Sequence, residues 1–132
     1  MKRYSFQWEP QKLTIVLRGV ITFEDVVELC DARIADPRFD SIQHILNDLR
    51  ELEGIDASKS DIRAALIYAN QSRHFGRRTR VMVSFVATDP GLRSHVLEFL
   101  AHANQQDHTW IRELFYSVEE ADAWAAQGLK SR

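Results

Sequence analysis

The chain has 132 residues, of which 45% are hydrophobic and 27% charged, a composition typical of one folded domain with an ordinary core. Its 17 Lys and Arg against 19 Asp and Glu give a net charge of −2, which argues against a nucleic-acid binder. The single cysteine, Cys30, excludes an intrachain disulfide and a cysteine metal cluster. Because the sequence shows no signal peptide and no apolar stretch that could cross a bilayer, we expect a cytoplasmic protein.

The N-terminal residues predict a β-hairpin. Tyr4, Phe6 and Trp8 alternate with polar residues, which is the period-two pattern of a half-buried strand. A short turn at 10–12 leads into a second strand at 13–20, which is rich in β-branched residues. A connection this short requires the two strands to be antiparallel.

A helix is predicted next, with Thr22 as its N-cap and Asp36-Pro37 as its end. Apolar residues recur on one face at helical spacing, which predicts a core stripe that includes Cys30 as a buried and unreactive thiol. The opposite face is acidic and consists of Glu24, Asp25, Glu28 and Asp31.

The remaining chain alternates strands with helices. Strands are predicted at 42–49, 81–87 and 110–115, and the second of these is apolar almost throughout, as in a central parallel strand covered on both faces. Helices are predicted at 60–72, after the Asp89 cap, and after the capping box that begins at Ser117. The last helix is expected to end at Gly128, followed by a disordered tail at 130–132.

The predicted order is therefore ββαβαβαβα. It indicates a single α/β domain over residues 1–132, with a mixed, mostly parallel five-stranded sheet and four helices. The first hairpin supplies the antiparallel strand.

This order and several short phrases resemble the STAS domain, the family of sulfate transporters and anti-sigma-factor antagonists, with its SpoIIAA-like fold. The chain looks most similar to short bacterial stand-alone proteins of the STAS/SEC14 type. The matching phrases open the first helix (21–25), follow it (35–40), lie in the third strand (47–50), precede the second helix (56–58) and open the last helix (119–124).

The resemblance implies a regulatory module that is switched when a kinase phosphorylates a serine before the second helix. The matching positions are Asp48 in the strand, Asp56 in the turn and Ser58 as phosphoacceptor. Ala57 stands where a serine often follows the aspartate in the family, and Lys59-Ser60 replaces the small glycine after the serine. The residues alone also allow Ser58 or Ser60 to be a plain helix cap.

Other candidate sites each have an ordinary structural alternative. Asp48 and Asp56 could form an acid/base pair, or they could bond turn amides. The residues His95, Glu98 and His102 share one helical face and could bind a metal with His108, although an exposed polar face explains them equally. Arg73, Arg77, Arg78 and Arg80 could form an anion-binding site, and the alternative is that they lie in a solvated loop.

Two functions of different classes follow from these residues. The first is a non-enzymatic interaction module that binds a kinase or anti-sigma-like partner at residues 56–63, including Arg63, and at the acidic first helix. The second is a carrier of a small molecule or lipid, which would need an enclosed apolar pocket beneath the second and third helices. We predict no cofactor and no catalytic motif, and a homodimer through an uncovered strand edge remains an open alternative, as does an unrecognised enzyme.

Overall fold

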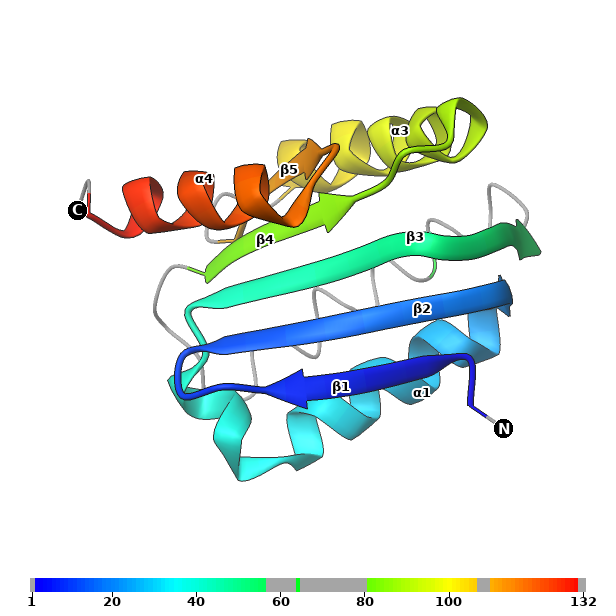
Figure 1. The fold of residues 1–132 in the computed structure, drawn as a ribbon. Helices are drawn as coiled ribbons and strands as arrows, with labels where there is room; N and C mark the ends of the chain where they lie inside the picture. Colours follow the sequence, from blue (N-terminus) through cyan, green and yellow to red (C-terminus); the bar gives the residue numbers. More distant parts are fainter. Residues whose placement is uncertain (1, 57–63, 65–80, 107–109, 131–132) are drawn as a thin grey trace.

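The protein is built on one five-stranded sheet whose strands lie in the spatial order β1-β2-β3-β4-β5 (Figure 1). The computed structural model describes residues 2–56, 64, 81–106 and 110–130. The strands are β1 (Tyr4–Trp8), β2 (Lys12–Thr22), β3 (His44–Asp56), β4 (Val81–Val86) and β5 (Trp110–Phe115). The β1–β2 pair is antiparallel and the other three pairs are parallel, which confirms the predicted mixed and mostly parallel sheet.

Helices cover both faces of the sheet. The described helices are α1 (Phe23–Ala35), the 3-10 helix η1 (Pro37–Ser41), α3 (Pro90–Gln106) and α4 (Val118–Lys130). Side chains of α1 and α3 join the main core cluster on one face, and α4 packs through Ala121 on Leu46 and Val86 on the other. The helix predicted at 60–72 lies outside the described residues.

The central strands are apolar because both of their faces are covered. Along β3, Ile45 and Leu49 contribute to the core under α1 and α3, whereas Leu46 faces α4. β4 is buried in the same way at Val81, Val83 and Val86. The near-continuous apolar runs in the sequence follow from this two-sided burial.

The prediction that the third strand ends at Leu49 is wrong. β3 continues to Asp56 beside β2, whereas its pairing with β4 ends at Asp48 and Val86. Residues 18–22 and 51–56 thus form a two-stranded extension, here called the β2–β3 ribbon, that runs past the end of β4 (Figure 1). Leu52 is buried while its neighbours Glu51 and Glu53 are exposed, so this polar stretch keeps strand alternation.

Two register shifts introduce the ribbon. One lies between Val16 and Arg18 and the other between Gly19 and Val20, and in both the extra residue is on β3. Gly19 has φ 67°, in the left-handed region that a side chain disfavours. Such bulges bend a strand pair and increase its twist.

The three predicted helix caps that lie in the described residues, at Thr22, Asp89 and Ser117, are confirmed. The Asp25 N–H donates to Thr22 Oγ1 at 3.3 Å and the Thr22 N–H to Asp25 Oδ2 at 2.9 Å, which is a complete capping box. The Leu92 N–H donates to Asp89 at the start of α3, and the Glu120 N–H to Ser117 Oγ before α4.

The predicted end of the last helix at Gly128 is wrong, because α4 continues to Lys130. A Cβ at position 128 would overlap the side chain of Met82, with its sulfur only 3.1 Å away. Gly128 therefore allows α4 to approach β4 closely, and this approach outweighs its low helix propensity. Lys130 is helical and does not belong to a disordered tail, while 131–132 lie outside the described residues.

Candidate functional site

The β2–β3 ribbon brings Thr22 and Asp56 together at one end of the sheet, where they are register partners. Thr22 caps α1, so Asp56 lies at the N-terminal end of that helix, and its side chain is exposed. Ser58, Ser60 and Arg63 belong to the next segment of the sequence and lie outside the described residues.

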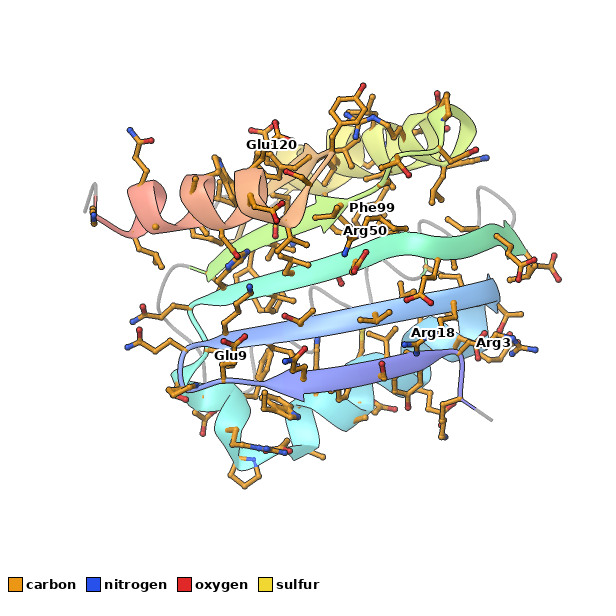
Figure 2. The ribbon with its side chains drawn as sticks, viewed as in Figure 1. Arg3, Glu9, Arg18, Arg50, Phe99 and Glu120 are labelled. Atoms are coloured by element: carbon orange, nitrogen blue, oxygen red, sulfur yellow. The ribbon has the colours of Figure 1, made fainter. Side chains whose placement is uncertain are left out.

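The acidic face of α1 is partly neutralised by the N-terminus. Arg3 pairs with Asp25 at 3.3 Å, and Lys2 pairs with Glu28. Figure 2 shows Arg3 at the same end of the sheet as Arg18 of the ribbon. The exposed Glu24 therefore lies beside carboxylates that already have cationic partners, so this end has mixed charge.

Asp48 lies on β3 directly before the first register shift and stabilises it through hydrogen bonds to Arg50. Its carboxylate accepts the Arg50 N–H at 3.1 Å and two guanidinium bonds at 2.9 and 2.8 Å (Arg50 is labelled in Figure 2). Side-chain hydrogen bonding from Arg50 lowers the pKa of Asp48. Asp48 and Asp56 are eight residues apart on one strand, about 26 Å, so the acid/base pair suggested by the sequence is wrong.

Asp48→Ala is expected to lower the free energy of unfolding by about 1.5–3 kcal/mol, because it removes charge-assisted bonds that fix the bulge. Urea unfolding of the variant measures the loss. Glu53→Ala on the same strand is the matched control and should change stability by at most about 0.5 kcal/mol. Equal effects of the two substitutions would show that Asp48 does not stabilise the bulge.

A buried polar link that sequence reasoning missed joins β3, β4 and α4. His44 Nε2 is hydrogen-bonded to Ser84 Oγ at 2.8 Å, and His44 Nδ1 lies 3.8 Å from Asp122, which pairs with Lys12 at 2.8 Å. Burial, followed by the charge of Lys12, lowers the pKa of His44 to about 4, while Asp122 opposes the shift. The sequence contains one indication of this link, because His44 and Ser84 are polar residues that each interrupt an apolar strand.

This Ser–His–Asp link is structural. Ser84 is completely buried, so its hydroxyl cannot reach a substrate, and the contact from His44 to Asp122 is longer than a hydrogen bond. A neutral histidine at physiological pH instead ties the start of β3 to β4 beneath α4.

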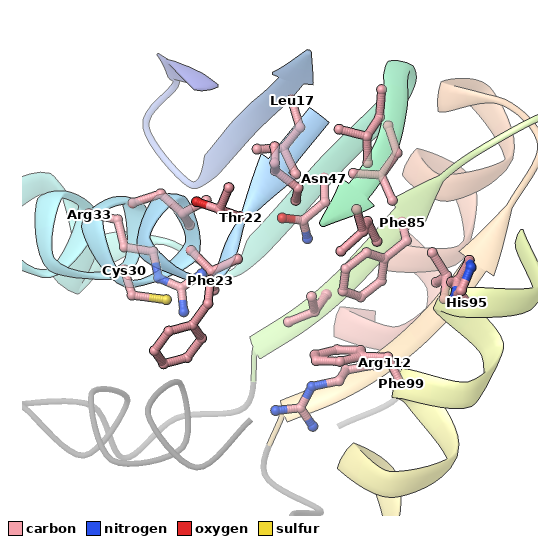
Figure 3. A pocket seen from close by; sticks show the side chains of 18 of the residues that line it. Leu17, Thr22, Phe23, Cys30, Arg33, Asn47, Phe85, His95, Phe99 and Arg112 are labelled. Atoms are coloured by element: carbon pink, nitrogen blue, oxygen red, sulfur yellow. The ribbon is translucent and has the colours of Figure 1, made fainter. Parts of the chain in front are cut away.

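An apolar cavity of about 190 Å³ lies on the face of the sheet that carries α1 and α3 (Figure 3). Its described lining comes from the ribbon, α1, the central strands, the edge strand β5 and α3, and includes Ile21, Leu52, Val26, Val83, Phe85 and Phe99. The carrier hypothesis requires an apolar pocket, but the sequence alone could not show that one exists.

Arg33 of α1 also lines this cavity and is 7% exposed. Its Nε has no hydrogen-bond partner, and no ion pair among the described residues involves it. The guanidinium carbon lies 5.4 Å from the ring centre of Trp110 and 5.8 Å from that of Phe39. Sequence reasoning missed Arg33, although it lies three residues after Cys30 and seven after Val26, on the core stripe.

The other predicted sites are not assembled by the described structure. His95, Glu98 and His102 form no metal-binding group, since the described residues contain no cluster of three potential ligands. His95 instead lies at the cavity (Figure 3). His108 and the arginines at 73, 77, 78 and 80 lie outside the described residues. Among the helices described, none is long and apolar enough to span a membrane.

The sheet order, the single antiparallel hairpin and the helices on both faces define this chain as an α/β domain of the SpoIIAA-like, or STAS, fold. The anti-sigma-factor antagonist SpoIIAA in its unphosphorylated form is similar over 95% of this chain and 98% of its own, with 13% identity and a TM-score of 0.56. A protein of the DUF3478 family from Shewanella loihica PV-4, with a SpoIIAA-like fold, matches over 92% and 91%, with 13% identity and a TM-score of 0.55.

No family model matches the sequence, and no curated protein is significantly similar to it. The resemblance read from short phrases is confirmed for the fold, and at 13% identity the structural likeness shows the fold alone.

Proposed function

We propose that this protein is a non-enzymatic regulatory module of the STAS type that binds a protein partner at the end of the β2–β3 ribbon. The observation that carries the proposal is the extension of β2 and β3 past the end of β4. A paired ribbon satisfies most of its own backbone hydrogen bonds, so it can present residues beyond the body of the sheet without unfolding.

The exposed surface of the ribbon suits a protein partner. Val20 is 47% exposed, and beside it Arg18 and Glu51 form a solvent-exposed ion pair at 3.5 Å. An apolar side chain within a rim of opposite charges is the composition of a small recognition surface. The tip adds the exposed Asp56 and Glu24.

Phosphorylation of Ser58 would regulate this surface. Ser58 follows Asp56 by two residues, directly before the helix predicted at 60–72. A phosphate adds nearly two negative charges, which a helix N-terminus stabilises and an acidic partner surface repels. SpoIIAA, whose fold this chain shares, is an anti-sigma-factor antagonist, and the corresponding partners here would be a kinase and an anti-sigma-like regulator.

Ser58→Asp is expected to change the recovery of a specific partner by about fivefold or more, because the added charge changes the free energy of binding by about 1 kcal/mol. Affinity purification from the native host with quantitative mass spectrometry measures this, and Ser58→Ala should behave like the unmodified protein. Ser94→Asp is the matched control, because it adds the same charge to an exposed serine in the first turns of α3.

An unmodified Ser58 in native cells, together with identical partners for Ser58→Asp and Ser58→Ala, would contradict the switch. Recovery that changes equally with Ser94→Asp would show a general effect of charge and would also contradict it.

The second candidate is a carrier of a small apolar molecule, and the cavity of about 190 Å³ favours it. The cavity is lined mainly by aliphatic and aromatic side chains, as small-molecule pockets are. Mass spectrometry under native and denaturing conditions would detect a co-purified ligand as a mass lost on unfolding.

A further inference from the structure

We infer that the cavity recognises a small apolar monocarboxylate, whose carboxylate pairs with the guanidinium of Arg33. This inference rests on the second candidate function, the carrier, and assigns the chemical class of its ligand. It does not depend on the regulatory proposal.

The first argument is the state of Arg33. An arginine is rarely fully buried unless it is paired, because removing the charge from water is costly. Arg33 is 93% buried, and its Nε–H has no acceptor. Contacts with the ring faces of Phe39 and Trp110 hold the guanidinium in place but accept none of its in-plane N–H bonds.

The second argument is the charge of the cavity wall. Arg33 and Arg112 both line the cavity, whereas no aspartate or glutamate occurs among its described lining residues. Arg112 is also buried, and its Nη1 donates to the Trp110 carbonyl at 3.1 Å. Figure 3 shows Arg33 entering from α1, on the side of the cavity opposite α3. A ligand anion at Arg33 would therefore meet no repelling carboxylate among these described residues.

The third argument is size. An apolar cavity of about 150 Å³ accommodates benzene, so about 190 Å³ accommodates a ring or a short alkyl chain with one acid group. A planar guanidinium edge matches the two oxygens of a carboxylate. The apolar walls at Val26, Val83 and Phe99 suit the hydrocarbon part.

Isothermal titration calorimetry with phenylacetate and its neutral amide, and with hexanoate and its amide, tests the inference. For the wild type, the acid of at least one pair should bind about 10 to 100 times more tightly than its amide, as expected for a charge-assisted hydrogen bond. Arg33→Met should reduce this preference to less than about threefold, while Arg33→Lys, which keeps the charge, should retain part of it. Arg38→Met is the control, because this exposed arginine lies outside the cavity lining and should leave the preference unchanged.

Each result decides a different claim. Equal binding of acid and amide to the wild type overturns the inference and leaves the carrier proposal standing. A lack of binding by all four probes overturns both, and an acid preference that survives Arg33→Met overturns the role of Arg33. If Arg33→Met does not fold, the wild-type ratio and Arg33→Lys still decide the matter.

Discussion

Phe39→Ala is expected to lower the free energy of unfolding by about 3–5 kcal/mol, a large part of the stability of a domain of this size. Phe39 is 2% exposed, its ring centre lies 6.3 Å from that of Trp110, and Arg33 lies over its face. Truncation leaves a cavity where η1 packs on the sheet and removes one of the two rings that hold Arg33. Urea unfolding with an unchanged m-value measures the loss.

Leu97→Ala provides the matched control, because Leu97 is 55% exposed on α3 and its truncation should change stability by at most about 0.5 kcal/mol. Phe39→Leu retains most of the buried volume and should lie between the two. If Phe39→Ala lowered the free energy of unfolding as little as Leu97→Ala, this would contradict the claim that Phe39 anchors η1 on Trp110 of β5.

Acidification from pH 6.5 to pH 4 is expected to lower the free energy of unfolding by about 2–3 kcal/mol through His44 alone. Burial lowers the pKa of His44 from 6.5 to about 4 in the folded protein. Well above pH 6.5 the ring is neutral in both states, and the full stability is present. As the pH falls below 6.5, His44 becomes protonated in the unfolded chain but stays neutral in the folded protein. The free energy of unfolding therefore decreases until the pH reaches the folded-state pKa of about 4.

Chemical denaturation at a series of pH values measures this dependence. His44→Gln should flatten the curve between pH 6.5 and 4, because glutamine does not titrate. A curve for His44→Gln that remains as steep as that of the wild type would show that His44 is not the group responsible.

Most elements of the fold could be predicted from local patterns, because those patterns have direct physical causes. The alternation at Tyr4–Trp8, the apolar run at Val81–Val86 and the capping box at Thr22 each match the structure. The ribbon could not be predicted, because two bulges shift the register and its charged residues and Gly54 read as a turn. Pairing with β2, a distant segment, determines where β3 ends.

The buried polar residues could not be predicted for a different reason. A charged residue such as Arg33 is by default assigned to solvent, and its helical spacing alone cannot show that aromatic rings cover it. The link from His44 to Ser84 joins two strands 40 residues apart, and only the sheet register brings them together. Buried polar residues that break the usual burial pattern, such as Arg33, are good candidates for functional sites.

Amide hydrogen exchange of the protein, free and bound to its captured partner, tests most directly whether the end of the β2–β3 ribbon is the binding surface. The proposal predicts that the partner slows exchange in residues 18–24 and 51–56, with little change in α4. Protection confined to α4 or to the outer edge of β1, with the ribbon unchanged, would contradict it.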